Sequence, residues 1–370
     1  PAGGALAVDR TAFSQMASEA VENHSLIEVQ RREALSLEEE AKEAAAVILA
    51  TGPLTSDALA QDLARYTGEE HLAFYDAAAP IVMADSLNTE KLFRQSRYED
   101  ADDGQGDYLN APFNKEEYDA FIAELINADR VIMRDFETKE LFQACQPIEE
   151  IARKGHDAPR YGTLKPVGLT DPRTGRRPWA AVQLRAEDAQ GQSYNLVGFQ
   201  TNLTFPEQRR VFRMIPGLEE AEFARYGVMH RNTFLDAPRL LDANLRFDAP
   251  SRELGTPVHV AGQLAGTEGY CEAIRAGVHA AIAVAAELAG VDAPALPEET
   301  AYGALMAYAT SPLTTDYQPS HVNFGIMKPL DQPLRNKRER YAAYAARGAV
   351  ALAGYMAQLS DAGLALPSER

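Results

Sequence analysis

The sequence has only two cysteines, Cys145 and Cys271, and one tryptophan, Trp179, in 370 residues. Two cysteines cannot form a disulfide framework, which indicates a reducing, cytoplasmic compartment. The longest apolar run, around residues 278–288, is rich in alanine and shorter than the ~18–20 residues that a membrane helix needs. The chain begins with Pro1 and has no charged-then-apolar leader, so we expect it to be a piece of a longer protein.

Several catalytic and cofactor motifs are also missing. The sequence contains no G-x-S-x-G, P-loop, zinc-binding or G-x-G-x-x-G motif. The pairs Gly3-Gly4 and Gly104-x-Gly106 lack the strand before and the helix after that a phosphate-binding turn requires. The seven histidines are isolated, which argues against a metal site. The phosphate cradle of a dinucleotide cofactor is therefore not expected in this chain.

Charge of one sign dominates, with 54 acidic and 36 basic residues and a net charge of −18. Residues 1–145 carry −17 and residues 251–370 carry −3, whereas residues 146–250 have 15 basic and 13 acidic side chains, a net of +2. Arginine suits phosphate groups, so this middle region could meet a nucleic acid, or it is simply a less acidic solvated surface. Its arginines include Arg173, Arg176, Arg177, Arg209, Arg210 and Arg213.

Two segments predict buried strands that run into glycine, Val47–Gly52 and Val258–Gly262. Continuous apolar runs of this kind are typical of parallel strands, whose carboxyl ends bind ligands in open α/β sheets. The second is followed by further glycines and a long alanine-rich helix, which would allow a dinucleotide to approach the backbone closely. We therefore expect an α/β fold with a dinucleotide-binding sheet in residues 1–52 and 251–370, interrupted by an inserted domain over residues 53–250.

Local patterns predict the remaining elements. A short helix or exposed turn is expected where Ser36 and Glu39 have capping-box spacing. Two β-rich segments separated by a polar turn indicate a hairpin. The elements expected are a helix over residues 10–23, a strand over 27–29, mostly helix with polar loops over 57–145 (99–107 being a loop), a hairpin of 179–184 with 194–200, and helices over 337–348 and 349–359.

Cys145 is the candidate nucleophile. It could be a small buried hydrophobe, the usual fate of a free cysteine. Its neighbours are polar, however, and Pro147 marks a turn close to a helix end, where a thiolate is stabilised. Cys271, inside the glycine-rich segment at the start of the long helix, is expected to be a packing residue.

Several strings together carry a family resemblance, and they occur in the family's order over essentially the whole chain. They are residues 1–10 (PAGGALAVDR), 50–56 (ATGPLTS), 195–201 (NLVGFQT), 213–217 (RMIPG), 226–233 (YGVMHRNT), 261–270 (AGQLAGTEGY) and 318–325 (QPSHVNFG). The sequence thereby resembles the folate- and FAD-dependent tRNA (uracil-5-)-methyltransferases, the TrmFO family. The fold that this implies is an FAD-binding, Rossmann-like sheet of the glutathione-reductase type, with its N-terminal part missing and an inserted α+β domain.

The resemblance implies a reaction. Such enzymes take a methylene group from 5,10-methylenetetrahydrofolate, reduce it with FADH2 that NAD(P)H regenerates, and place it on carbon-5 of the T-loop uridine of tRNA. Carbon-5 of uracil is a poor nucleophile, so a thiolate must first add at carbon-6. By resemblance Cys145 is that thiolate, and we expect its sulfur and the turn 262–270 to face one flavin-lined cleft. Neither a membrane, DNA nor a metal ion is an expected partner.

The resemblance also implies binding residues. The expected FAD contacts are Gly52, Gly262, Gln263, Glu268, Gly269, Tyr270, Asn323, Phe324 and Gly325. The expected folate or uridine pocket holds Tyr226, His230, Arg231 and Asn232, although a purely structural turn is the alternative for each of these four. The family's glycine-rich FAD motif and its second catalytic cysteine would precede Pro1, so we expect this chain alone to hold FAD weakly and to be inactive.

Two alternatives stay open. One is the related flavin enzyme family that modifies the wobble uridine of tRNA together with a GTPase partner, which shares the sheet and the inserted domain. The string 50–56 and the short C-terminal helical region favour the methyltransferase. The other alternative, from a different class, is a tRNA-binding module without catalytic activity.

Overall fold

The computed structural model divides into two compact units. Unit 1 comprises Pro1–Arg31 and Tyr75–His230, and unit 2 comprises Arg32–Phe74 and Arg231–Arg370. These divisions differ from the boundaries expected from the sequence, after residues 52 and 250, which stay a prediction. The residues that the structure describes are 8–68, 73–98, 106–132, 146–188, 190–315 and 317–364.

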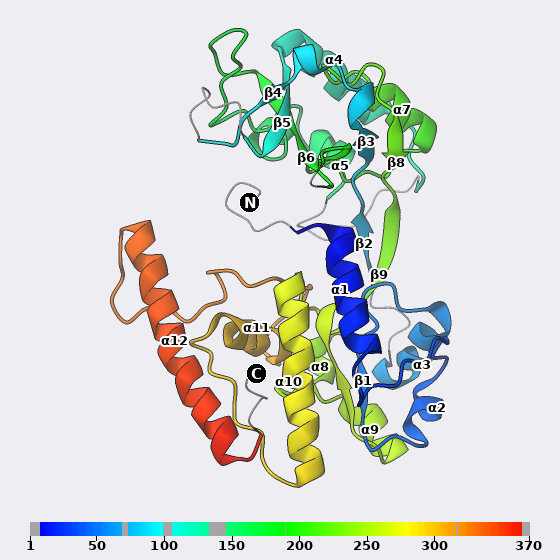
Figure 1. Cartoon of the computed structure of the whole chain (residues 1–370), viewed down its shortest axis with the longest axis vertical. Coiled ribbons are helices and arrows are strands. Elements are labelled where there is room, and N and C mark those ends of the chain that lie inside the picture. The colour runs from blue at the N-terminus through cyan, green and yellow to red at the C-terminus, as the bar shows by residue number, and fades with distance from the viewer. Residues whose placement is uncertain are drawn as a thin grey trace. The chain divides into compact units, whose positions relative to one another are not determined.

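Unit 2 is built around two short parallel strands (Figure 1). β1 (Val47–Leu49) pairs in register with β10 (Val258–Val260), which confirms the two strands expected from the sequence. Leucines and aromatic residues from the surrounding helices complete a buried core on these strands. The other elements are α2 (Leu37–Ala41), α3 (Asp57–Thr67), α8 (Ala237–Leu240), α9 (Asp248–Leu254), η5 (Gly262–Ala265), α10 (Tyr270–Ala289), α11 (Ala301–Thr310) and α12 (Lys337–Asp361).

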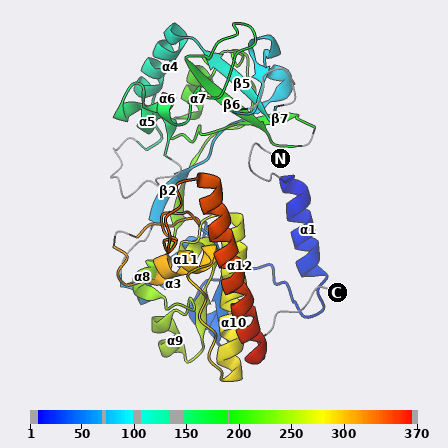
Figure 2. The ribbon, with the colours of Figure 1, turned by 90° about the vertical axis from the view of Figure 1, so that its left-hand side faces the viewer.

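Helices α10 and α12 lie side by side, as both views show (Figures 1 and 2). Ile282 of α10 forms a separate apolar cluster with Tyr355 and Leu359 of α12. The two helical segments expected near the C-terminus are one continuous helix, because Gly348 at their junction does not adopt a left-handed φ and the helix runs through it. Asn336 caps the start by accepting from the N–H groups of Arg338 and Glu339.

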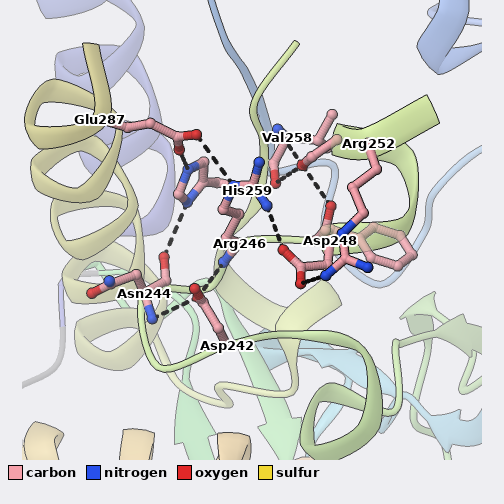
Figure 3. Close-up of polar contacts among 10 residues, drawn as sticks. Asp242, Asn244, Arg246, Asp248, Arg252, Val258, His259 and Glu287 are labelled. Atoms are coloured by element: carbon pink, nitrogen blue, oxygen red, sulfur yellow. Dashed lines mark hydrogen bonds and ion pairs between the residues drawn. The ribbon is translucent and has the colours of Figure 1, made fainter. Parts of the chain in front are cut away.

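A polar network ties β10 to α10 and to the loop before α9 (Figure 3). The ring of His259, only 1% exposed, places Nε2 3.2 Å from a carboxylate oxygen of Glu287 and Nδ1 3.0 Å from the carbonyl of Asn244. Arg246 donates to the other oxygen of Glu287 at 3.3 Å, and Asp242 accepts from the backbone N–H groups of Asn244 and Arg246. Each ring nitrogen of this histidine inside a strand therefore lies within hydrogen-bond distance of an oxygen atom.

Unit 1 is organised by an antiparallel six-stranded sheet in the order β4-β5-β6-β7-β3-β8. The division between the units runs through two further paired strands, β2 (Ala73–Ala77) and β9 (Met229–Thr233). The elements of unit 1 are α1 (Arg10–Glu22), β3 (Ile81–Met83), η1 (Ala84–Ser86), η2 (Thr89–Lys91), β4 (Phe93–Arg94), β5 (Tyr108–Phe113), α4 (Lys115–Asn127), α5 (Ile148–Lys154), α6 (Ala158–Tyr161), β6 (Ala180–Ala186), β7 (Ser193–Leu196), α7 (Phe205–Phe212) and β8 (Phe223–Arg225).

The core of unit 1 forms where helices pack against this sheet (Figure 2). On α4, the fully buried residues Tyr118, Phe121, Ile122 and Leu125 are spaced three and four apart, which puts them on one helical face. Phe121 packs against Phe113 at the end of β5, with ring centroids 5.2 Å apart. This buried face therefore holds α4 against the end of β5, the strand that precedes it.

Two sequence-based expectations are wrong. Residues 27–29 form no strand, because their side chains are largely exposed and no described strand pairs with them. Residues 57–145 are not mostly helical, since four strands, β2 to β5, lie in this span. β5 escaped detection because it is buried on both faces, lacks alternation and contains Asn110 and Pro112, both unusual in strands.

Other expectations are confirmed. The helix over residues 10–23 is α1, and the segment after Ser36 is the short helix α2, whose first turn Ser36 caps. The hairpin is the antiparallel pair β6 and β7. The loop expected over 99–107 lies mostly outside the described residues.

Candidate functional site

Two glycines lie at the carboxyl edge of the parallel strands in unit 2. Leu49 pairs with Val260, and the N–H of Ala261 donates to the carbonyl of Leu49 at 2.8 Å, so the chain leaves both strands at the same edge. Gly52 and Gly262 follow there with left-handed φ angles of 73° and 69°. A Cβ at Gly52 would meet nothing within 4 Å. This edge is therefore bare backbone that a ligand can approach closely.

The turn after β10 is tightly held. The hydroxyl of the half-buried Tyr317 donates to the carbonyl of Ala265 at 3.0 Å, and loss of water around it raises the pKa of this phenol above its usual value. A Cβ on Gly266, whose φ is 76°, would overlap that hydroxyl. Gln263 donates to the carboxylate of Glu268 at 2.9 Å. Two predicted cofactor contacts thus lie against each other in a rigid turn.

The start of α10 has no side-chain cap. Gly269 occupies the N-cap position with a φ of 105°, and no side chain accepts from the N–H groups of the first turn. The positive end of a helix dipole favours negative charge, and the carboxylate of Glu272 lies over Gly269 at this end. Tyr270 is 78% exposed there. Cys271 is also exposed, so the expectation that it is a packing residue is wrong: it lies on the solvent side of α10.

The turn 323–325 joins this assembly. The N–H of Val322 donates to the carboxylate of Glu272 in the first turn of α10 at 3.1 Å, which attaches the two segments. Asn323 accepts from the N–H of Gly325 at 2.9 Å and so closes the turn. Between them Phe324, 45% exposed, stacks on Tyr341 of α12 with ring centroids 4.2 Å apart. The structure therefore brings 262–270 and 323–325 together within unit 2.

Asn232 lies next to the same edge. The N–H of Thr233 donates to the carbonyl of Pro53 at 2.7 Å, and the N–H of Leu235 donates to the carbonyl of Leu264 at 2.8 Å. The strand end that carries Asn232 therefore runs from the β1 loop to the η5 turn, and Asn232 itself is buried.

The other predicted pocket residues belong to unit 1 or have side chains outside the described part of the chain. Tyr226 belongs to unit 1, where its ring stacks between Phe205 at 4.8 Å and Phe223 at 5.0 Å, and its hydroxyl accepts from Arg209 at 3.1 Å. The backbones of His230 and Arg231 belong to β9, but their side chains are not described. Cys145 lies outside the described residues, so its expected approach to the 262–270 turn stays a prediction.

A buried carboxylate that sequence reasoning missed lies just after Cys145. Glu149 is fully buried at the start of α5, where it accepts from the hydroxyl of Thr201 at 3.0 Å and from the N–H of Asn202. Burial raises its pKa to about 7, because loss of water outweighs these hydrogen bonds. The amide of Asn202 in turn bonds both backbone groups of Ile132.

Glu149 and Asn202 therefore tie together the described residues on either side of the Cys145 segment. The sequence shows only a glutamate directly after Pro147 and Ile148, in the first turn of a helix. Acidic residues are favoured at this position and are usually exposed there, so the residue type alone did not indicate burial. Only the burial of that helix start shows that it is unusual.

A metal-ion site and a membrane-spanning helix are both absent from the described residues. In those ranges, no three histidine, cysteine, aspartate or glutamate side chains are grouped as ligands of a metal ion. In the same part of the chain, no helix combines the length and the hydropathy that crossing a bilayer requires.

Comparison with known proteins gives one family match and many relatives. Residues 1–292 match the family described as glucose inhibited division protein A, GIDA. The chain is 52% identical over 347 residues to a Thermosynechococcus vestitus protein, covering 93% of this chain and 73% of the relative. It is 51% identical to a Geobacter sulfurreducens protein, covering 92% and 76%. Both relatives are named methylenetetrahydrofolate–tRNA-(uracil-5-)-methyltransferase TrmFO.

Among solved structures, the chain resembles Aquifex aeolicus GidA in two crystal forms. Form I gives a TM-score of 0.64 at 15% identity and covers 94% of this chain, and form II gives 0.61 at 15% identity and covers 85%. The chain spans 61% and 54% of the two GidA chains. At this identity the likeness concerns the fold, and it confirms the expected α/β class with a Rossmann-like sheet.

Proposed function

We propose a function for this chain from one premise, which its relatives establish: the chain belongs to the TrmFO family, the methylenetetrahydrofolate–tRNA-(uracil-5-)-methyltransferases. The family resemblance of the sequence is thereby confirmed, and the family is one of enzymes that methylate uracil of tRNA at carbon-5. The proposal is that it transfers a one-carbon unit from 5,10-methylenetetrahydrofolate to carbon-5 of the T-loop uridine, with FAD as reductant and NAD(P)H as the source of electrons.

The observation that carries the proposal is the glycine edge of unit 2 beside the uncapped start of α10. We tested whether these residues suit FAD. The open space at Gly52 and the left-handed Gly262 leave room for a cofactor to lie against backbone, and the start of α10 adds the positive end of a helix dipole. They fit this group, although the glycine-rich phosphate motif is not in the sequence.

Individual residues have distinct proposed roles at this edge. When bound, the flavin supplies the electrons that turn the transferred methylene into a methyl group. The first-turn N–H groups of α10 bind the negative charge of the cofactor, and Glu268, held by Gln263, orients its hydroxyl groups. Phe324, stacked on Tyr341, presents an apolar face that excludes water from the turn.

Cys145 is the proposed nucleophile. Its thiolate sulfur forms a bond to carbon-6 of uracil, and the electron pair of the 5,6 double bond moves into an enolate that makes carbon-5 nucleophilic. Carbon-5 then bonds the methylene carbon as one of that carbon's two bonds to folate nitrogen breaks. Loss of the carbon-5 proton expels tetrahydrofolate by breaking the second carbon–nitrogen bond. A hydride equivalent from the reduced cofactor would then make the methyl group, as the sulfur leaves carbon-6 and the 5,6 double bond forms again. The uridine has to leave its stack for this chemistry, and Asn232, Tyr226, His230 and Arg231 are its proposed contacts, or those of the folate.

The test is transfer of labelled methylene carbon to tRNA by the full-length natural protein, with FAD and NAD(P)H supplied. Cys145→Ser should abolish formation of ribothymidine, because a hydroxyl is a far weaker nucleophile than a thiolate. Cys271→Ser is the matched control, since it removes the other, exposed cysteine, and it should keep full activity.

Three results would contradict the proposal. Label in the wobble uridine would indicate the related flavin enzyme instead. Full activity of Cys145→Ser would exclude Cys145 as nucleophile. Binding of tRNA without any transfer by the full-length protein would indicate a binding module. That the 370-residue chain alone is inactive stays a prediction, tested by the same assay.

A further inference from the structure

Unit 1 contains a large open cavity whose lining includes none of the predicted site residues. Its volume is about 590 Å³, and it opens between the end of β5, the start of α4 and the loop that leads into β6. This volume lies within the range of cavities that hold small ligands, ~300–1,000 Å³. The lining residues are Lys91, Pro112, Phe113, Asn114, Glu117, Asp171, Arg173, Thr174, Arg176, Arg177, Pro178, Trp179 and Pro216.

The charged groups of the cavity are mostly committed to structural partners. Asp171 is buried and accepts from both Nε and Nη2 of Arg173, at 3.1 and 2.8 Å, so this pair is neutral. Lys91 pairs with Glu219 at 2.6 Å. Glu117 accepts from the backbone N–H of Asn114 at 2.9 Å as part of a capping box on α4.

Arg176 and Arg177 are the exception. Both are exposed, and neither guanidinium forms a hydrogen bond or ion pair with a described residue. The loop that carries them is nevertheless well defined: the N–H of Asp171 donates to the carbonyl of Arg176 at 2.9 Å, and Gly175 makes the turn with a left-handed φ of 65°. Two uncommitted positive charges are thus held at the cavity in a chain of net charge −18.

An aromatic side chain forms part of the same lining. Trp179 is fixed from both sides of its peptide, because its N–H donates to the carbonyl of Phe113 at 2.9 Å and its carbonyl accepts from Arg160 at 3.0 Å. The Arg160 guanidinium covers the ring at 3.6 Å from the centroid. The indole N–H is buried and has no hydrogen-bond partner among the described residues. A polar atom is therefore left for a ligand to satisfy.

We propose that this cavity binds a phosphodiester of the substrate tRNA, with Arg176 and Arg177 holding the phosphate oxygens and Trp179 contacting the adjoining nucleotide. The inference rests on the proposed function, since it takes tRNA as the substrate. Paired guanidinium groups suit phosphate, and an aromatic ring beside them suits a ribose or base. The cavity is larger than a single inorganic anion needs, which favours a nucleotide unit over a free phosphate.

The first test uses Trp179, the one tryptophan among these 370 residues, as a probe, and Trp179→Phe is the control that identifies its emission in the full-length protein. Titrating the full-length protein with unmodified tRNA should change the tryptophan emission saturably, at the same midpoint as binding measured on filters. Inorganic phosphate and poly-γ-glutamate, which lack the nucleotide, should leave the emission unchanged at equal charge concentration. Saturable tRNA binding with no change in emission would overturn the inference.

The second test removes the two charges. The double variant Arg176→Gln, Arg177→Gln should weaken tRNA binding about tenfold and flatten the dependence of log K on log salt by about 1–2 units. The matched control is Arg185→Gln, Arg225→Gln, which removes two exposed arginines of the same unit that lie outside the cavity lining. It should change the binding constant less than about twofold.

The outcomes separate this inference from the proposed function. Equal losses of affinity in both double variants would mean that only net charge matters, and would overturn the cavity as a site. Unchanged tRNA binding with a raised KM for folate would point to a carboxylate ligand and overturn it as well. Wild-type protein that binds no tRNA would contradict the proposed function itself. Thermal unfolding of each variant checks that the fold is intact.

Discussion

The two units of this chain present ligand-binding features of opposite kinds. In unit 2 the candidate residues line a bare backbone edge, where Gly52 and Gly262 follow two parallel strands and the start of α10 is uncapped. In unit 1 the candidate cavity is built from charged and aromatic side chains on an antiparallel sheet, with Arg176 and Arg177 uncommitted. The first suits a cofactor bound through N–H groups, and the second suits a phosphate chain bound through guanidinium groups.

The difference also concerns where polar groups are buried. In unit 2 both ring nitrogens of the buried His259 lie beside oxygen atoms, whereas in unit 1 burial of the Glu149 carboxylate raises its pKa to about 7. The packed edge of unit 2 should therefore be sensitive to added atoms, and unit 1 should be sensitive to pH. The following predictions test this contrast, from the largest effect to the smallest.

Gly266→Ala should destabilise unit 2 most. The left-handed φ of 76° costs a non-glycine residue about 1–2 kcal/mol, and overlap with the Tyr317 hydroxyl adds about 1–3 kcal/mol. Urea unfolding measures the loss. Gly255→Ala is the matched control, because its φ is 68° but nothing lies within 4 Å of the added methyl group, so only the conformational cost applies. Equal losses in the two variants would show that the Tyr317 contact is unimportant.

Glu149 should make unit 1 less stable as the pH rises. A carboxyl whose pKa rises from 4.5 to about 7 on folding stabilises fully below pH 4.5, and this stability is lost as the pH rises through 7. The loss is on the order of 3 kcal/mol at 1.36 kcal/mol for each pKa unit. In Glu149→Gln, the free energy of unfolding should differ less between pH 5 and pH 8 than it does in the wild-type protein.

The control for this prediction is Glu116→Gln, an exposed glutamate in the first turn of α4. It should retain the pH dependence of the wild-type protein. A wild-type pH dependence that survives in Glu149→Gln would mean that another group causes it.

Glu287→Ala should cost unit 2 about 1–3 kcal/mol, because it leaves Nε2 of the buried His259 without its partner. Arg246 loses a partner in the same variant. Glu298→Ala removes a solvent-exposed pair with Lys328 and should cost less than about 1 kcal/mol. If the two variants unfold at the same urea concentration, the His259 network contributes nothing specific.

The smallest expected losses of stability come from removing one N-terminal helix cap in each unit. Asn114 accepts from Glu117 at 2.8 Å in a complete capping box, whereas Ser36 accepts from Glu39 at the longer distance of 3.3 Å. Asn114→Ala should therefore cost about 1 kcal/mol and Ser36→Ala about 0.5 kcal/mol. Thermal unfolding ranks them, and the reverse order would contradict this use of cap geometry.

Much of unit 2 could be predicted because its signals are local. The run Val47–Leu49 is apolar throughout, Val258–Val260 has valines on either side of His259, and the glycines that follow both strands mark the turns. Buried parallel strands and close backbone approach both leave such signatures in consecutive residues. The contact between 262–270 and 323–325 was expected only from the resemblance, since nothing in either segment specifies its partner.

Unit 1 was predicted less well because its sheet joins distant segments. β3 pairs with β7 and β8, more than 100 residues away, and β5 carries Asn110, which a strand tolerates here because its amide donates to the carbonyl of Gln95 at 2.9 Å. Such compensation cannot be read from neighbouring residues. The exposure of Cys271 was missed for the same reason, since helical periodicity in an alanine-rich sequence does not say which face is covered.

The sequence by itself determined the family, the parallel strands with their glycine edge, the helix caps and the surplus of arginine in residues 146–250, because each depends on residue type and short spacing. Only the tertiary structure decided which of these arginines lack partners, that Glu149 is buried, and that Trp179 lines a cavity with Arg176 and Arg177. The physical reason is that burial and pairing are properties of the space between elements, which forms only when segments far apart in the chain pack together.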